Sequence, residues 1–328
     1  MKVLSLFSGI GGLDLASEAT GMEIVAFSEI EPYACEVLKR RWPKVVNLGD
    51  IRNITGNLLR NAGIGTEEVD IIIGGFPCQP FSVIGRRKGK EDDRFLWPEF
   101  ARVVKEVRPV WVVAENVPGI LCSAVDDVLA DLEAQGYSAG AFVYPAQAVG
   151  APHRRDRTFI VAYSESKRCE RMRAVREQKP EAHVREKEVA WNSCGSRKLS
   201  GKLWRTPDAH CDRGPCSDGK MQKKLTDGLP ININDQAKQS GSRGRLNPDW
   251  VECLMGFPIG WTDVNCDSPA PWPGWPAGPF EAQHEYEPPR MATGIPNAGK
   301  RLKCLGNAVV PQQAYPVFKA IAEAERRR

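Results

Sequence analysis

Short apolar runs alternate with helix-like segments over the first 165 residues of this 328-residue chain. Such alternation is typical of a mostly parallel sheet that is covered by helices on both faces. The runs with the length of buried strands are Val3–Phe7, Ile24–Phe27, Val69–Ile73 and Val110–Ala114. The sequence therefore predicts a doubly wound α/β fold, whose ligand sites lie beyond the carboxyl ends of the strands.

Helices are expected between and after these strands. A proline in the first turn, as at Pro32 and Pro248, favours a helix start. The apolar residues of one predicted helix share a face that we interpret as core: Leu96, Phe100, Val103, Val104 and Val107. The further predicted elements are the helices Glu31–Arg41, Ala124–Gln135, Leu246–Met255 and Gln312–Glu325 and the strands Ala139–Tyr144 and Thr158–Ala162.

The pattern changes after Tyr163, where a charged stretch leads into a segment rich in Gly, Ser, Asn, Asp and Lys. Residues 166–245 hold 19 Lys and Arg against 10 Asp and Glu, a local charge of +9, whereas the whole chain carries +4. A basic segment favours a polyanionic partner such as nucleic acid, although a solvated, salt-bridged surface has the same composition. We expect three parts, at 1–165, 166–245 and 246–328, the last with an irregular, proline-rich stretch from Ser268 to Pro296.

Two classes of protein do not fit the chain. No stretch has the residue order of a secretory signal, and no apolar run approaches the roughly 20 residues that span a membrane. The ten cysteines are scattered, which favours reduced thiols, and the spacing of Cys211 and Cys216 does not match the usual zinc pairs. We expect a cytoplasmic protein without a membrane contact or a metal site.

The segment Phe7–Gly12, with glycine at Gly9, Gly11 and Gly12, follows the first strand and leads into a helix. A doubly wound fold places a nucleotide-like ligand against such a turn. Glu29, at the end of the second strand, can accept hydrogen bonds from ribose hydroxyls, and Asp50, further along the chain and before Val69–Ile73, can meet the amine of an adenine. The spacing departs from the strict dinucleotide motif, so a plain tight turn stays an alternative.

Chemistry-bearing residues follow the next strands. Cys78 stands in the loop Gly74–Ser82, where flanking prolines and glycines indicate an exposed thiol and not a buried core cysteine. Glu115 ends the following strand, although a helix cap or a surface charge explains it equally. Arg155 and Arg157 precede another strand, and alternation predicts that they point to one side. A thiol, a carboxylate and two arginines are thus expected at one rim of the sheet.

At this point the chain resembles the C-5 cytosine DNA methyltransferases. It has His153 where that family has Gln, and Ala308 where it has Ser. The segments similar to the family's motifs occur in the family's order: Phe7–Gly12, Glu29–Ile30, Asp50–Ile51, Pro77–Gln79, Glu115–Val117, Arg155–Arg157, Arg245–Pro258 and Gly306–Val309.

The resemblance implies roles for these residues. It makes residues 1–165 the catalytic and cofactor-binding domain, 166–245 the target-recognition domain, and 246–328 a segment that returns to the first. The methyl donor S-adenosylmethionine would be held by Phe7, Gly9, Gly11, Gly12, Glu29, Ile30, Asp50, Ile51, Pro77, Leu96, Asn307 and Val309.

The family chemistry needs a thiol because carbon 5 of cytosine is a poor nucleophile. The Cys78 thiolate would add at carbon 6 and turn the ring into an enamine whose carbon 5 attacks the methyl group. By analogy, Glu115 would hold ring nitrogen 3 and the exocyclic amine, while Arg157 and Arg155 would hold the carbonyl oxygen and the thiol loop. The base must first be flipped out of the duplex. Basic residues of the thiol loop would then close on phosphate, unless they form only a solvated loop: Arg86, Arg87, Lys88 and Lys90.

The expected partner is double-stranded DNA, with a restriction endonuclease acting on the same sequence as a further possible one, and a monomer is the simplest expectation. An RNA cytosine methyltransferase shares much of this motif set. A nicotinamide oxidoreductase would explain the Gly-rich turn and Glu29, but not Cys78, Glu115 and the arginines. A nucleic-acid-binding protein that has lost catalysis is a third alternative, which only an assay excludes.

Overall fold

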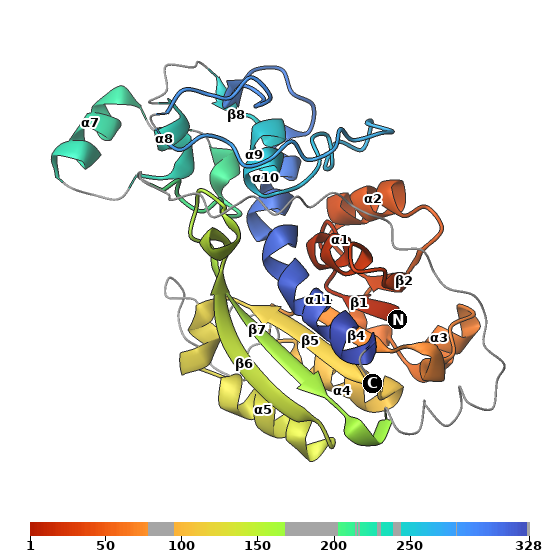
Figure 1. Ribbon diagram of the computed structural model, residues 1–328. Coiled ribbons are helices and arrows are strands. Elements are labelled where there is room, and N and C mark those ends of the chain that lie inside the picture. The colour runs from red at the N-terminus through yellow and green to blue at the C-terminus, as the bar shows by residue number, and fades with distance from the viewer. Residues whose placement is uncertain are drawn as a thin grey trace.

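The computed structural model describes residues 1–77, 95–167, 203–213, 215, 217–227, 231–238, 244–279 and 281–326. Its centre is a seven-stranded sheet with the order β3-β2-β1-β4-β5-β7-β6 (Figure 1). The strands are β1 Lys2–Leu6, β2 Glu23–Ser28, β3 Val46–Asn47, β4 Ile71–Gly75, β5 Trp111–Asn116, β6 Ser138–Pro145 and β7 Asp156–Tyr163.

The first five strands run parallel, whereas β7 pairs antiparallel with both β5 and β6. The predicted doubly wound, mostly parallel α/β fold is therefore confirmed. One strand is displaced from its prediction. It was expected at Val69–Ile73 but extends to Gly75, because Gly74 and Gly75 continue the register opposite Ala114 and Glu115.

Helices cover both faces of the sheet (Figure 1). The apolar side chains of β1 and β4 alternate between two cores, with Val3 and Ile71 in one and Leu4 and Ile72 in the other. Strands that are buried on both faces read as continuous apolar runs in the sequence. One core contains α1 Gly12–Glu18, α2 Pro32–Arg41 and α11 Pro311–Arg326; the other contains α3 Gly56–Asn61, α4 Trp97–Val107 and α5 Val125–Ala134.

Short elements make up the described chain between Leu203 and Asn307, in the upper part of Figure 1. The helices are α7 Asp218–Thr226, α8 Ile233–Lys238, α9 Pro248–Leu254 and α10 Ala298–Asn307, and β8 Arg245–Leu246 pairs antiparallel with β9 Met291–Ala292. Single 3₁₀ turns are η1 Ile51–Asn53, η2 Thr66–Glu68, η5 Pro118–Cys122, η6 Ala146–Val149 and η7 Cys211–Arg213.

One prediction is confirmed in this part and another needs correction. The helix expected within Leu246–Met255 is α9, which begins at Pro248 because Leu246 belongs to β8 and the Asn247 side chain caps the helix by accepting from the Asp249 backbone N–H. The proline-rich stretch from Ser268 to Pro296 contains the short strand β9, where no proline interrupts the pairing.

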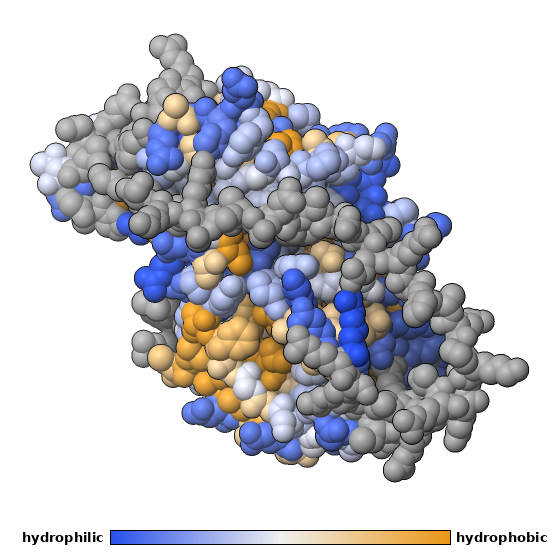
Figure 2. All heavy atoms as spheres, viewed as in Figure 1, coloured by the Kyte–Doolittle hydropathy of each residue, from blue (hydrophilic) through white to orange (hydrophobic). Residues whose placement is uncertain are grey.

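Hydrophobic residues gather on the face that carries β6, β7 and α11 (Figure 2). Phe142 of the edge strand β6 keeps 43% of its surface exposed. Apolar and aromatic side chains from the sheet and α11 line a cavity of about 370 Å³ there. Within the part of the chain that the structure covers, no helix has the length and apolar character needed to cross a membrane.

Candidate active site

The glycine-rich turn between β1 and α1 lies against the loop that follows α10. Phe7, Gly9 and Gly11 have positive φ angles of 51°, 56° and 81°, a conformation that is unusual for a residue with a Cβ such as phenylalanine. A Cβ on Gly12 would lie only 2.5 Å from the Val309 carbonyl oxygen. The turn and the 306–309 loop therefore approach each other through glycine, as a cofactor site built from both would require.

Glu29 is fixed against this turn. Its Oε2 accepts from the Gly9 backbone N–H at 2.7 Å, and its Oε1 accepts from the N–H groups of Ile30 at 2.9 Å and Glu31 at 2.8 Å. A carboxylate oxygen has about two lone pairs, so Oε2 can accept one more hydrogen bond. This acceptor suits a ribose hydroxyl.

The other predicted cofactor residues have mixed surroundings. Asp50 caps η1 by accepting from the Arg52 N–H at 3.0 Å, and its second oxygen contacts the Arg52 guanidinium at 3.1 Å. Ile51 is buried, whereas 62% of Ile30 and much of Asn307 are exposed. Pro77 and Leu96 are half-buried on either side of residues 78–94, which lie outside the described residues.

Glu115 and Arg157 form an ion pair on neighbouring antiparallel strands. Arg157 Nε lies 2.8 Å from Glu115 Oε1, and the two side chains are 14% and 10% exposed. Burial raises the pKa of Glu115, and the positive charges of Arg157 and Arg155 oppose that rise. Gly75 stands opposite Glu115, where a Cβ would lie 2.7 Å from Oε2. The sheet thus provides a nearly buried carboxyl group whose proton is retained to higher pH than usual.

Arg155 has different partners from Arg157. It precedes β7 with a φ of 35°, so the strand alternation that predicted a shared side does not apply to it. Its guanidinium is buried and donates to the carbonyl oxygens of Pro207 at 2.7 Å, Gly306 at 2.8 Å and Ala308. Arg155 therefore joins three segments that are distant in the sequence.

His153 also lies in the interior. Its Nε2 is 3.0 Å from the Leu254 carbonyl oxygen, to which it donates in the matching tautomer. Burial is the main cause that lowers the pKa of His153, to about 3. His153, one of the two departures noted in the sequence, is thus a neutral core histidine that connects the segment before β7 to α9.

Two positioning residues were missed from the sequence. Asn116 donates from Nδ2 to the Phe76 carbonyl oxygen at 2.9 Å and so fixes the chain where it leaves β4 toward Cys78. Gly75 leaves the space that Glu115 fills. The Glu115-Asn116 pair and the double glycine before Pro77 were visible as motifs, but their contact depends on the register of β4 and β5.

The predicted nucleophile and phosphate contacts lie outside the described residues: Cys78, Arg86, Arg87, Lys88 and Lys90. The last described residue before them, Pro77, follows the segment that Asn116 holds. The chain therefore enters the predicted thiol loop beside the Glu115–Arg157 pair.

Comparisons with known proteins show which family the chain resembles. A family model described as C-5 cytosine-specific DNA methylase matches residues 1–247. The Type II methyltransferase M.NgoFVII of Neisseria gonorrhoeae is 39% identical over 165 residues, which cover 49% of this chain and 43% of that protein. The Type II methyltransferase M.AquIA of Picosynechococcus sp. is 36% identical over 175 residues, which cover 49% of this chain and 71% of that protein.

A solved structure extends the likeness to the whole chain. A mutant of DNMT2 from Spodoptera frugiperda has a TM-score of 0.59 and 19% identity, and the match covers 97% of this chain and 98% of that one. At that identity the likeness concerns the fold. The chain spans less than half the length of the Neisseria relative. The family model, in contrast, covers three quarters of this chain, including the glycine turn, the Glu115 motif and the arginine pair. The chain belongs to the C-5 cytosine-specific DNA methylase family.

Proposed function

We propose that the protein transfers a methyl group from S-adenosylmethionine to carbon 5 of cytosine in double-stranded DNA, within a short specific sequence. The observation that carries the proposal is the nearly buried Glu115–Arg157 pair at 2.8 Å, beside the point where the chain enters the Cys78 loop. A carboxyl group and a guanidinium side by side match the amine, ring nitrogen and carbonyl oxygen along one edge of cytosine.

The chain's own residues account for activation of the base. The Cys78 thiolate forms a bond to carbon 6, and the electrons of the 5,6 double bond move so that carbon 5 becomes nucleophilic. Glu115, whose pKa burial raises, donates its proton to ring nitrogen 3 as charge accumulates, and Arg157 holds the carbonyl oxygen. After methyl transfer, carbon 5 loses its proton to a base, the carbon–sulfur bond breaks and returns the thiolate, and ring nitrogen 3 gives its proton back to Glu115.

The glycine turn and its surroundings suit the methyl donor. S-Adenosylmethionine, when bound, supplies an electrophilic methyl group. Gly9, Gly11 and Gly12 allow a ligand to approach the backbone, and Glu29 has acceptor capacity for a ribose hydroxyl. The remaining predicted contacts, from Asp50 to Val309, complete this site in the proposal.

The other segments of the chain have proposed roles in binding DNA. In the proposal, residues 1–165 form the catalytic and cofactor-binding domain, 166–245 recognise the target, and 246–328 return to the first domain. Cytosine is flipped out of the duplex, because neither a thiol nor a carboxyl group reaches its edge while it is stacked and paired. The basic side chains of Arg86, Arg87, Lys88 and Lys90 then contact phosphate. The enzyme acts in the cytoplasm as a monomer, and a restriction endonuclease for the same sequence is its expected companion.

The test compares the protein with its Cys78→Ser variant in a host free of DNA methylation, by methylation-aware sequencing of the host DNA. We expect 5-methylcytosine in one short sequence context with the first protein and none with the variant. A folded protein that binds S-adenosylmethionine but marks no DNA would refute the DNA substrate, and methylation of cellular RNA would identify the substrate as RNA. Marking that persists in the variant would refute Cys78 as the nucleophile.

A further inference from the structure

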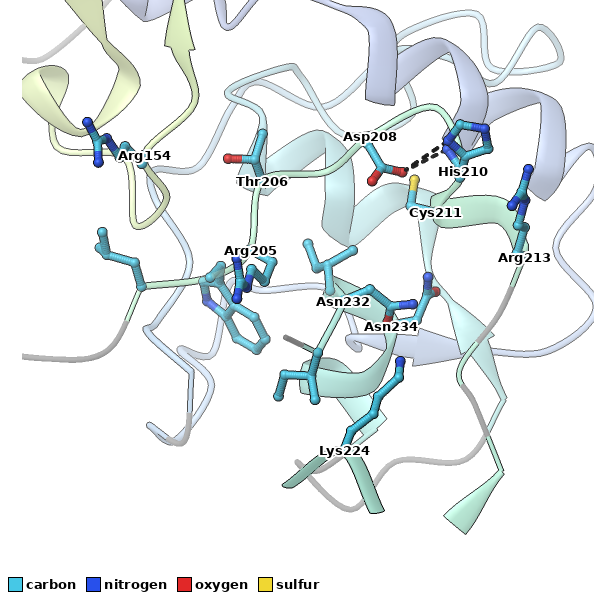
Figure 3. A pocket seen from close by; sticks show the side chains of 14 residues that line it. Arg154, Arg205, Thr206, Asp208, His210, Cys211, Arg213, Lys224, Asn232 and Asn234 are labelled. Carbon is cyan, nitrogen blue, oxygen red and sulfur yellow. Dashed lines mark hydrogen bonds and ion pairs between the residues drawn. The ribbon is translucent and has the colours of Figure 1, made fainter. Parts of the chain in front are cut away.

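A second cavity, of about 730 Å³, lies between Arg154, the segment 203–213, Lys224 and the segment 231–234 (Figure 3). Neither Glu115 nor Arg157 lines it. Figure 3 shows polar side chains from these segments surrounding one space. The cavity is therefore a candidate binding site outside the site proposed for methyl transfer.

Positive charge predominates in the lining of this cavity. Four basic side chains, Arg154, Arg205, Arg213 and Lys224, face one carboxylate, Asp208. Arg154 is paired with Asp156 at 2.8 Å, and Lys224 with the buried Asp235 at 3.0 Å. The side chains of Arg205 and Arg213 are exposed, and neither forms an ion pair with a side chain that the structure describes. These two guanidinium groups are available to an anion, and Arg binds phosphate with two parallel hydrogen bonds.

Asn234 places in this cavity a hydrogen-bond acceptor to which no described residue donates, and an anion alone does not supply a donor. Its side chain lines the cavity and is 1% exposed, and its Oδ1 has no hydrogen-bond partner within the described residues. A buried acceptor without a donor is unfavourable, so such an atom calls for a ligand group that donates. A bare phosphate would face Oδ1 with another acceptor. The ligand must therefore combine a negative group with a hydrogen-bond donor.

The apolar part of the lining narrows the class of ligand further. Leu203, Trp204, Ile231 and Ile233 border the same space. Such side chains pack against the flat face of a heterocycle. A nucleotide has all three features, namely a phosphate, an apolar base face and a base edge with amine or ring N–H donors. Asparagine is also one of the side chains that read base edges in DNA.

We propose that this cavity binds one nucleotide of the DNA other than the cytosine that is methylated. Its flanking phosphates contact Arg205 and Arg213, which lie on two sides of the cavity (Figure 3), and a donor on its base edge bonds to Asn234 Oδ1. Asn234 is then a specificity-determining residue, whereas the two arginines contribute affinity that is independent of sequence. This inference rests on the proposed function, because it takes DNA as the partner.

The experiment selects bound duplexes from a randomised DNA library with the full-length protein, without any methylation step. We expect the wild type to enrich a short sequence. Asn234→Ala should lose the preference at one position of that sequence by about tenfold or more, as expected for one base contact. Its unfolding midpoint, measured in parallel, shows whether the variant is folded.

Charge variants provide a second readout if Asn234→Ala does not fold. Arg205→Gln and Arg213→Gln should weaken binding to all sequences equally and each reduce the salt slope of the binding constant by about 1. Lys105→Gln removes the same charge from the exposed side of α4 and should leave the slope unchanged. A slope that neither arginine variant changes overturns the phosphate contact.

The outcomes separate this inference from the proposed function. An Asn234→Ala variant that selects the same sequence as the wild type overturns the inference even if cytosine methylation is active. A wild type without any sequence preference overturns it too. A protein that selects DNA through Asn234 but transfers no methyl group supports the cavity and refutes the proposed function.

Discussion

At the scale of single residues, Arg155 and Arg157 have different partners although they are only two positions apart. Arg157 lies on β7 and pairs with Glu115, so its guanidinium stays at the site. Arg155, two residues earlier, is 2% exposed and donates to the carbonyl oxygens of Pro207, Gly306 and Ala308. It connects the approach to β7 with the 306–309 loop, so we infer that it positions the site and does not contact the base.

Arg155→Lys should therefore lower stability and weaken the binding of S-adenosylmethionine. One ammonium group cannot replace a planar guanidinium that donates to three fixed carbonyls, and we expect a loss of about 1.5–3 kcal/mol in the free energy of unfolding. Denaturant unfolding and calorimetric binding measure the two effects. Arg157→Lys is the matched control and should lower kcat with little change in stability. An Arg155→Lys variant with wild-type stability and a reduced kcat would show that Arg155 acts on the substrate.

Glu115→Gln should lower kcat by about 10²–10⁴-fold, the usual range for loss of a proton-transfer group. Burial raises the pKa of Glu115, so its protonated form persists to higher pH than that of an ordinary glutamate. If that form donates to the base, kcat falls as pH rises through the raised pKa. This falling limb should disappear in the variant, because glutamine does not titrate. A pH–rate profile of the variant that keeps the limb would assign it to another group.

At the scale of elements, the register of β4 and β5 builds the site. The two strands pair in parallel so that Gly75 stands opposite Glu115, and Asn116 reaches back to the Phe76 carbonyl. The glycine is required because a side chain there would occupy the place of the Glu115 carboxylate. Glycine is required at Gly12 of the cofactor turn for a similar reason, because a side chain there would meet the Val309 carbonyl oxygen.

Gly75→Ala should lower kcat by about 10²-fold or more and leave the protein folded. The added Cβ would lie 2.7 Å from Glu115 Oε2, and a side-chain end can move aside at a small cost in stability, but only by leaving its place beside Arg157. Steady-state kinetics and thermal unfolding test this. Gly140→Ala on β6 is the control and should change neither property, since a Cβ added there would have nothing within 4 Å. Full activity of Gly75→Ala would contradict a fixed position for Glu115.

At the scale of the whole molecule, a buried ion pair holds distant segments together. Arg301 of α10 donates to Glu252 of α9 at 2.8 Å, with side chains 2% and 0% exposed. Glu252 also accepts from the backbone N–H groups of Gly260 at 2.6 Å and Thr262 at 2.7 Å. Tyr33 of α2 donates to the Thr262 carbonyl oxygen at 2.8 Å. The network thus fixes the 260–262 turn to α2, α9 and α10.

Glu252→Ala should lower the free energy of unfolding by about 3–5 kcal/mol, because it leaves the Arg301 charge buried with a weaker set of partners. Denaturant unfolding measures this loss. Glu68→Ala removes a partner of Lys2 from an ion pair whose side chains are 46% and 40% exposed, and should cost less than about 1 kcal/mol. Equal losses in the two variants would contradict a central role for the buried network.

The sequence by itself determined the fold class and the motif set. Apolar runs such as Val3–Phe7 and Ile24–Phe27 predicted the parallel strands. A strand that is buried on both faces is a continuous apolar run, which can be recognised in the sequence without knowing which strands pair with it. The glycines of Phe7–Gly12 and the carboxylates at strand ends located the rim of the sheet. Pro248 indicated a helix start for the same local reason.

Only the tertiary structure decided which of these residues meet. The separate roles of Arg155 and Arg157, the space that Gly75 leaves for Glu115, and the contact of Asn116 with Phe76 depend on strand register and on a single positive φ angle. The cavity around Asn234 likewise brings together Arg154, Arg213 and Lys224, which no local pattern connects. Hydrophobic periodicity fixes an element and its buried face, whereas contacts between residues far apart in the sequence arise only when the elements pack.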